Sequence, residues 1–134
     1  MSQQNHHRVL LVEDNVPLGL VTSEVLKQLG HDVDWRVSAD EAFDTLSHAN
    51  QFDAILLDLG LGADDGVSLI GALRQRGFAL PPILIFSAQP VDALRFAARA
   101  TGATAILQKP CTAVQLDAAI LLAVSGNQAG TRRS

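Results

Sequence analysis

Residues 54–58 read Ala-Ile-Leu-Leu-Asp, a short apolar run that ends in a carboxylate. Similar runs stand at residues 9–14, Val-Leu-Leu-Val-Glu-Asp, and at residues 83–87, Ile-Leu-Ile-Phe-Ser. Runs of this length without polar alternation are typical of strands buried on both faces, as in a parallel sheet. Two further strands are predicted at residues 32–36 and 104–107, which makes five strands in all.

Helical stretches separate these strands. The predicted helices follow the capping residues Asn15 and Ser38, cover about 67–76 and 91–100, and run from Thr112 to about 124. Within the first helix, apolar residues from Leu18 to Leu29 recur at helical spacing. Strands that alternate with crossover helices predict an α/β fold whose parallel sheet is covered on both faces.

Composition restricts the class of protein. A chain of 134 residues is one domain, and 48% hydrophobic with 18% charged residues excludes a disordered chain. A formal charge of −4 argues against a nucleic-acid partner. One cysteine excludes an internal disulfide and a multi-cysteine metal site. We expect a domain at 8–124, with a disordered tail at 1–7 and a flexible tail at 125–134.

The sequence also indicates where the protein works. No apolar run reaches the roughly 18 residues that a membrane span needs. The polar N-terminal stretch lacks the apolar core of a signal peptide. We therefore expect a cytoplasmic protein without a membrane partner.

The polar residues that follow the strands form the candidate site. They are Glu13, Asp14, Asp58, Ser87 and Lys109. Because the carboxyl ends of parallel strands meet at one edge of a sheet, these residues are expected to share one crevice. Taken singly, each fits a turn, a helix cap or a solvated surface position. Taken together, the five residues contradict that interpretation, because several separate strands would each have to end by chance in a polar group that suits the same site.

The chemistry of this set points to phosphoryl transfer. Crowded carboxylates repel one another unless a cation lies among them, and hard oxygen ligands suit Mg²⁺. A carboxylate that attacks a phosphoryl group gives an aspartyl phosphate, whose equatorial oxygens need metal, ammonium and hydroxyl partners. Mg²⁺, Lys109 and Ser87 would supply those three partners.

At these residues the chain resembles the receiver domain of bacterial two-component response regulators. Within that family it resembles the stand-alone receivers, such as the chemotaxis regulators. The resemblance runs from about Arg8 to Val124. It is carried by residues 9–15, by Ile-Leu-Leu-Asp-Leu-Gly-Leu at 55–61 with Asp-Gly at 65–66, by Ile-Phe-Ser-Ala at 85–88, and by Gly-Ala at 102–103 with Lys-Pro at 109–110. It implies a flavodoxin-like doubly wound sheet of strand order 2-1-3-4-5.

The resemblance also implies roles for the site residues. Asp58 would be the phosphoacceptor, and Asp14 would ligate Mg²⁺ together with Asp58 and the Gly60 carbonyl. Glu13 would act on the metal through water. Ser87 and Lys109 would contact the phosphoryl group, and the Lys109–Pro110 peptide is expected to be cis.

Partners follow from the same resemblance. The donor would be a histidine kinase, a histidine phosphotransfer domain or a small phosphodonor. The output would be protein contacts through the face of the fourth helix, fifth strand and fifth helix. The last helix is apolar nearly all round. This predicts either an exposed strip that contacts a downstream protein or a second copy in a homodimer, or a helix that packs more deeply against the sheet. The chain is not expected to be an enzyme beyond its own phosphorylation and dephosphorylation.

Several positions depart from the family pattern. Ile106 stands where an aromatic side chain usually couples to the switch hydroxyl, and a β-branched aliphatic cannot swing a ring. Gly62 replaces a loop proline. Gly60 and Gln89 occupy positions that tune phosphoryl lifetime, and the small Ala88 fits access for a phosphodonor.

Four other functions can be compared with that of a stand-alone receiver. A receiver domain from a hybrid histidine kinase and a degenerate receiver used as a constitutive binding scaffold stay as alternatives. A phosphatase of the haloacid dehalogenase type needs an acid two residues after the nucleophile, where Gly60 stands. A flavodoxin-like flavin binder needs a phosphate loop after the first strand, which Glu13 and Asp14 would repel.

Overall fold

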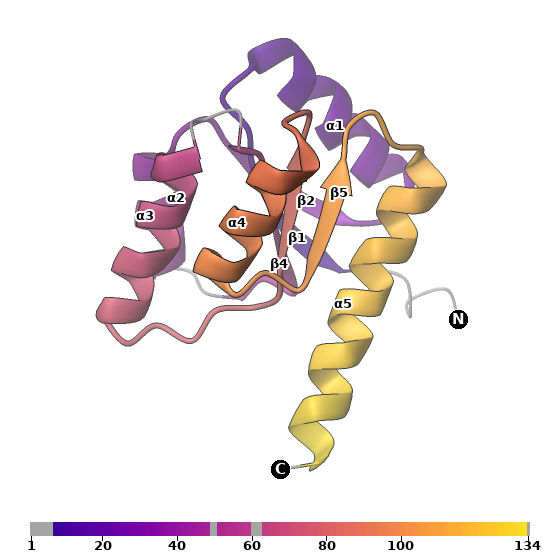
Figure 1. Ribbon diagram of the computed structural model, residues 1–134. Coiled ribbons are helices and arrows are strands. Elements are labelled where there is room, and N and C mark those ends of the chain that lie inside the picture. Colours follow the sequence, from indigo (N-terminus) through magenta and orange to yellow (C-terminus); the bar gives the residue numbers. More distant parts are fainter. Residues whose placement is uncertain (1–6, 49–50, 60–62, 134) are drawn as a thin grey trace.

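A five-stranded parallel sheet forms the centre of the protein (Figure 1). The computed structural model describes residues 7–48, 51–59 and 63–133, of which 63–65 and 127–133 are described by backbone only. The strands are β1 (Arg8–Val12), β2 (Asp32–Arg36), β3 (Ala54–Leu57), β4 (Ile83–Ser87) and β5 (Ala105–Gln108). Their order is β2-β1-β3-β4-β5, which confirms the predicted doubly wound topology.

Five helices connect the strands and cover both faces of the sheet. They are α1 (Val16–Gln28), α2 (Ala39–His48), α3 (Ala63–Gln75), α4 (Val91–Thr101) and α5 (Ala113–Arg133). Helices α2, α3 and α4 lie on one face, and α1 and α5 lie on the other (Figure 1).

Side chains start the helices where the sequence predicts. The Asn15 side chain accepts a hydrogen bond from the main chain of the first turn of α1 at 3.0 Å. The Ser38 hydroxyl accepts from the N–H of Glu41 at 3.1 Å. Thr112 and Gln115 bond each other's main-chain N–H groups at 2.9 and 3.1 Å, the reciprocal arrangement of a capping box. Each cap satisfies N–H groups that the first turn of a helix leaves without partners.

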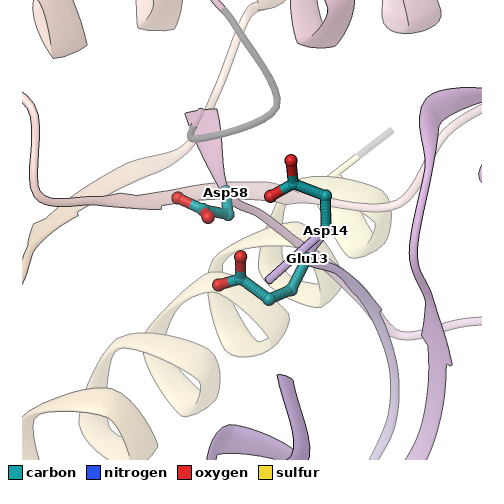
Figure 2. Close-up of side chains that lie close together, drawn as sticks. All are labelled: Glu13, Asp14 and Asp58. Atoms are coloured by element: carbon teal, nitrogen blue, oxygen red, sulfur yellow. The ribbon is translucent and has the colours of Figure 1, made fainter. Parts of the chain in front are cut away.

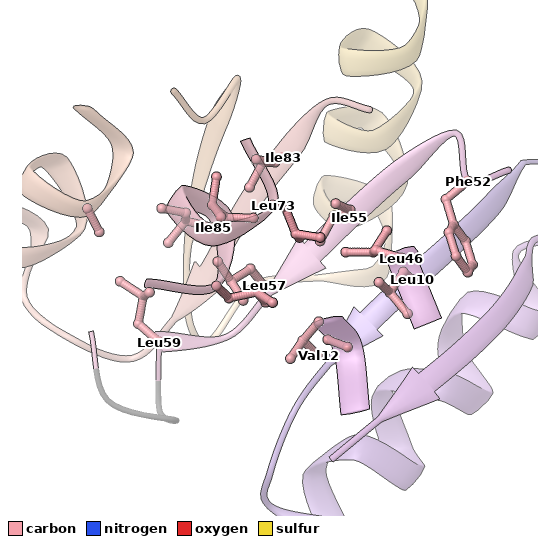
Figure 3. Close-up of a cluster of buried hydrophobic side chains, with 14 of the residues drawn as sticks. Leu10, Val12, Leu46, Phe52, Ile55, Leu57, Leu59, Leu73, Ile83 and Ile85 are labelled. Atoms are coloured by element: carbon pink, nitrogen blue, oxygen red, sulfur yellow. The ribbon is translucent and has the colours of Figure 1, made fainter. Parts of the chain in front are cut away.

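The strands divide their side chains between two aliphatic cores. Leu10, Ile55 and Ile83 point to the core under α2, α3 and α4, whose members Figure 3 shows. The residues that follow them, such as Leu11 and Leu56, point to the core under α1 and α5. Because successive side chains of a strand face opposite sides, an unbroken apolar run fills both cores.

The buried face of α1 differs from its apolar repeat. Leu18 and Val21 are exposed, whereas Gly19, Ser23 and Leu26 face the sheet. The apolar spacing correctly predicts a helix but not which side packs. The packed side is set by the ring of Trp35, which lies so close to the helix that only a glycine fits beneath it.

At both ends of the described chain, the structure extends beyond the predicted strand and helix bounds. The last helix was expected to end near residue 124, but α5 continues to Arg133 and projects past the sheet (Figure 1). No proline interrupts residues 125–133, so the hydrogen-bond ladder already nucleated in α5 propagates. At the other end, His7 belongs to the fold: its main-chain carbonyl accepts from the N–H of Asp32 at 3.0 Å. Residues 1–6 lie outside the described residues.

Across the described residues, every helix is too short or too polar to traverse a bilayer.

A buried histidine ties α5 to the start of β2. The His31 ring lies 2.8 Å from the Asp117 carboxylate through Nε2, and its Nδ1 accepts from the N–H of His7 at 3.3 Å. The rings of His7 and His31 are stacked with centroids 5.8 Å apart. Since Nδ1 accepts, the neutral ring carries its hydrogen on Nε2, and this N–H donates a hydrogen bond to the Asp117 carboxylate.

Asp117→Ala is expected to lower the free energy of unfolding by about 1–3 kcal/mol, because it leaves the buried Nε2–H of His31 without an acceptor. Urea denaturation measures the change. Asp44→Ala is the matched control, since Asp44 forms a similar histidine pair with His48 that is exposed on both sides. Its effect is expected to stay below about 0.5 kcal/mol. Equal losses in the two variants would contradict a structural tie at His31.

Candidate functional site

The residues that follow the strands meet at one edge of the sheet. The N–H of Asp58 donates to the carbonyl of Val12 at 3.0 Å, and the N–H of Lys109 donates to the carbonyl of Ser87 at 2.8 Å. These bonds extend the ladders of β1–β3 and β4–β5 by one residue beyond the strands. The side chains at 58 and 109 are therefore held by the regular sheet.

An open cleft of about 630 Å³ lies at this edge. It is lined by Glu13, Asp14, Asn15, Leu18, Asp58, Ser87, Ala88, Gln89 and Lys109. The five residues that follow the predicted strands thus come together across almost a hundred sequence positions. Asn15 and Leu18, at the start of α1, line the cleft without having been predicted there.

Three carboxylates face one another in the cleft (Figure 2). Glu13, Asp14 and Asp58 each bring an oxygen within 4.8 Å of the other two. Glu13 is 1% exposed and Asp58 is 4% exposed, whereas Asp14 is open to solvent. Two buried acids and one exposed acid therefore concentrate negative charge at the floor of the cleft.

Lys109 is the cation of this group. Its Nζ lies 3.0 Å from Oε1 of Glu13 and 3.6 Å from Oδ2 of Asp58. The ammonium also lies 4.6 Å from the centre of the Phe86 ring, where a cation meets the negative face of the aromatic system. One ammonium among three carboxylates leaves an excess of negative charge.

Burial and the excess negative charge both affect the pKa of Glu13. Burial, with the neighbouring Asp58 carboxylate, raises the pKa of Glu13 from 4.5 to about 7. Lys109 and the N–H of Asn15, which donates to Oε2 at 3.2 Å, oppose that rise. The opposing contacts are too weak to restore an ordinary acid.

This donor set fits a hard divalent cation. Mg²⁺ prefers a few carboxylate oxygens and keeps water on its remaining positions, which an open cleft allows. The exposed Asp14 and the buried Asp58 offer such oxygens, and Glu13 stands behind them. A cation would also oppose the rise in the Glu13 pKa that burial and the Asp58 carboxylate cause. The Gly60 carbonyl was expected to ligate the metal. Gly60 and Gly62 lie outside the described residues.

Ser87 lies buried at the rim of the acidic group. Its Oγ accepts from the N–H of Gln89 at 3.3 Å. The Gln89 side chain in turn donates to the carbonyl of Leu59 at 3.1 Å, and the Gln108 side chain donates to the carbonyl of Gln89 at 3.0 Å. Hydrogen bonds thus join the segments after β3 and β4 to the end of β5.

Ile106 lies away from the cleft. It lies on β5, pairs in register with Ile85 of β4 and is exposed. The peptide between Lys109 and Pro110 is cis, as predicted.

Trp35 is a residue that sequence reasoning did not connect to the site. Its indole Nε1–H donates to the main-chain carbonyl of Glu13 at 2.9 Å. The residue lies on β2, apart from the strand ends from which the site was predicted. Gly19, inside the apolar first helix, was the sequence signal that could have revealed this contact, because a glycine in a helix can mark the close approach of another group.

Known proteins agree with this geometry. Residues 9–121 match the model of the response regulator receiver domain. The chain is 34% identical over 116 residues to the response regulator protein PmrA of Pseudomonas aeruginosa, covering 84% of this chain and 50% of PmrA. It is 35% identical over 111 residues to the transcriptional regulatory protein TctD of Salmonella typhimurium, covering 83% and 49%. The chain spans about half the length of these curated relatives.

Solved structures extend the comparison. The receiver domain of the sensor histidine kinase PA1611 from Pseudomonas aeruginosa, which has a magnesium ion coordinated in its active-site cleft, superposes with a TM-score of 0.76 at 26% identity. The match covers 90% of this chain and 98% of that one. The non-phosphorylated HemR receiver domain from Leptospira biflexa gives a TM-score of 0.71 at 30% identity, covering 89% and 94%. With strand order, family model and relatives in agreement, the chain belongs to the receiver domains of two-component response regulators, whose signalling depends on phosphorylation.

Proposed function

We propose that this chain is a switch that accepts a phosphoryl group on Asp58 and signals through contacts with another protein. The observation that carries the proposal is the convergence of Asp58, Lys109, Ser87 and the acidic pair in one open cleft. The phosphoryl donor is a phosphohistidine of a histidine kinase or phosphotransfer domain. Both the donor and the receiver would act in the cytoplasm.

In the proposed reaction, an Oδ of Asp58 attacks phosphorus while the bond from phosphorus to the donor nitrogen breaks. The donor histidine keeps that electron pair and becomes a neutral imidazole on protonation. Lys109, already 3.6 Å from Oδ2 of Asp58, would pair with one phosphoryl oxygen. The Ser87 hydroxyl would donate to a second oxygen. The small Ala88 leaves the rim of the cleft open to a donor side chain.

Asp14 and Asp58 would hold Mg²⁺, with Glu13 behind them through water. When bound, the ion supplies electrostatic stabilisation of charge on the transferring group. The chain's own contribution is positional: the sheet holds Asp58, and Glu13 keeps the Lys109 ammonium beside it. Gln89 at the rim, with Gly60, would influence how long the aspartyl phosphate persists.

The proposed output surface is the face of α4, β5 and α5. Phe96 on α4 is 69% exposed, and Leu122 on α5 is 74% exposed. Val114 on α5 and Ile106 on β5 are also exposed, whereas Leu116 and Ile120 pack against the sheet. Exposed apolar side chains on these three elements support contact with a downstream protein or a second copy of the chain.

Phosphoryl uptake tests the proposal directly. Incubation with Mg²⁺ and acetyl phosphate is expected to add one phosphoryl group, seen by intact mass, and chelation with EDTA is expected to prevent it. Borohydride reduces an aspartyl phosphate to homoserine, so peptide mapping is expected to find homoserine at position 58. A phosphoryl group on another residue would refute the assignment of Asp58. Failure to take up phosphate and to bind beryllofluoride with Mg²⁺ would favour a constitutive scaffold.

A further inference from the structure

Strand β2 forms hydrogen bonds with both the main-chain N–H and the main-chain carbonyl of Glu13. The N–H of Glu13 donates to the carbonyl of Arg36 at 3.0 Å, and the carbonyl of Glu13 accepts from the Trp35 indole N–H at 2.9 Å. The first bond continues the β1–β2 ladder, but the second comes from a side chain. The Glu13–Asp14 peptide is therefore oriented by an indole ring as well as by the sheet.

The ring itself is held by α1. A Cβ atom on Gly19 would overlap the Cζ2, Cε2 and Nε1 atoms of Trp35, so the ring lies directly on the helix backbone. Gly19 is one of the buried residues of α1. A glycine inside a helix destabilises it by roughly 0.5–1 kcal/mol relative to alanine. At this position the absent side chain leaves room for the ring that reaches Glu13.

We propose that Trp35 is a positioning residue for the acidic pair: its indole N–H orients the Glu13–Asp14 peptide so that the Asp14 carboxylate faces Asp58. The inference rests on the proposed function, because it concerns the oxygens offered to Mg²⁺. Asp14 is the exposed member of the three acids, so packing does not hold its side chain. Its direction depends on the peptide before it.

The consequence is specific to cation binding. With the indole bond removed, the peptide gains rotational freedom and Asp14 must be ordered when the ion binds. The loss of one hydrogen bond to an oriented carbonyl corresponds to about a tenfold change in an equilibrium constant. A tryptophan that only packs would alter the thermal midpoint and leave the Mg²⁺ affinity unchanged.

Trp35→Phe separates these two roles, because phenylalanine keeps a ring and lacks the donor. Isothermal titration with Mg²⁺ is expected to give a Kd about tenfold higher than in the wild type. Val33→Ala is the packing control: Val33 lies on the same strand and in the same core. It is expected to lower the thermal midpoint with no change in Kd. Benzothienylalanine at position 35, which replaces the N–H by sulfur in an isosteric ring, is expected to behave like phenylalanine and covers the case in which Trp35→Phe folds poorly.

A glycine pair tests the same geometry from the helix. Gly19→Ala is expected to displace the indole and weaken Mg²⁺ binding. Gly71→Ala on α3 is the matched control, since nothing lies within 4 Å of its added methyl group, and its Kd is expected to equal that of the wild type.

The outcomes distinguish the two proposals. Wild-type Kd values in the Trp35 ring variants, with Asp14→Asn abolishing binding, would overturn the positioning role and leave the proposed function standing. Absence of both Mg²⁺ binding and phosphorylation in the wild type would overturn both. A tenfold weaker Kd in the Trp35 ring variants but not in Val33→Ala would establish the positioning role.

Discussion

Asp58→Asn is expected to abolish phosphoryl uptake and, in the metal-free protein, to raise the free energy of unfolding at pH 7. The two effects have one cause. The Asp58 carboxylate is the group that would attack phosphorus, and it is also a buried negative charge beside Glu13 and Asp14. Asparagine keeps the shape and removes both the nucleophile and the charge.

The stabilisation is expected to be about 1–2 kcal/mol, the equivalent of roughly one pKa unit of relieved repulsion. Lys109 loses its contact with Asp58 at 3.6 Å but keeps the shorter one to Glu13 at 3.0 Å. Urea denaturation in EDTA measures the change, and intact mass after incubation with acetyl phosphate and Mg²⁺ measures uptake.

Added Mg²⁺ provides the internal control. The proposed site would bind the ion through the carboxylates of the folded wild type. Saturating Mg²⁺ is therefore expected to stabilise the wild type and to have little effect on Asp58→Asn. A variant that is less stable than the wild type in EDTA would show that Asp58 is not under repulsion. A variant that still gains a phosphoryl group would show that another residue is the acceptor.

The second large effect is a loss of stability as the pH rises. The pKa of Glu13 is about 7 in the folded protein against 4.5 for an ordinary glutamate. Between those values the folded state binds a proton that the unfolded state has released. The free energy of unfolding therefore falls as the pH rises from about 4.5 through 7, by up to about 3 kcal/mol in the metal-free protein.

Glu13→Gln isolates this contribution, because glutamine cannot titrate and fits the same space. Denaturation in EDTA at pH 5, 6, 7 and 8 is expected to show a steep fall for the wild type and a flatter curve for the variant. Saturating Mg²⁺ is expected to flatten the wild-type curve as well, since a neighbouring cation favours the ionised carboxylate. Parallel curves for the two proteins in EDTA would contradict a raised Glu13 pKa.

In the proposed function, the same acids serve phosphoryl transfer and destabilise the metal-free fold. Replacing one acid by a neutral residue is expected to make the metal-free fold more stable, yet these acids are the groups that a phosphoryl site needs. Perturbed titration of this kind is frequent where charged groups are gathered for chemistry.

Local sequence determined most of the architecture. Unbroken apolar runs such as residues 54–57 indicate strands buried on both faces, and the clusters on both sides of the sheet confirm this. Asn15, Ser38 and Thr112 begin helices as predicted, because a capping side chain needs only the next turn of its own chain. The convergence of Asp58 with Lys109 followed from topology, since the ends of parallel strands share one edge.

Tertiary structure decided what depends on a distant neighbour. Leu18 and Val21 carry the apolar repeat of α1, yet the helix turns Gly19 to the sheet, because the ring of Trp35 from another element occupies that space. The raised pKa of Glu13 likewise depends on its burial in the fold and on Asp58, 45 positions away in the chain. Periodicity and capping act within a turn or two of one segment, and so sequence alone reveals them. Close packing and electrostatic coupling act between segments that only the completed fold brings together.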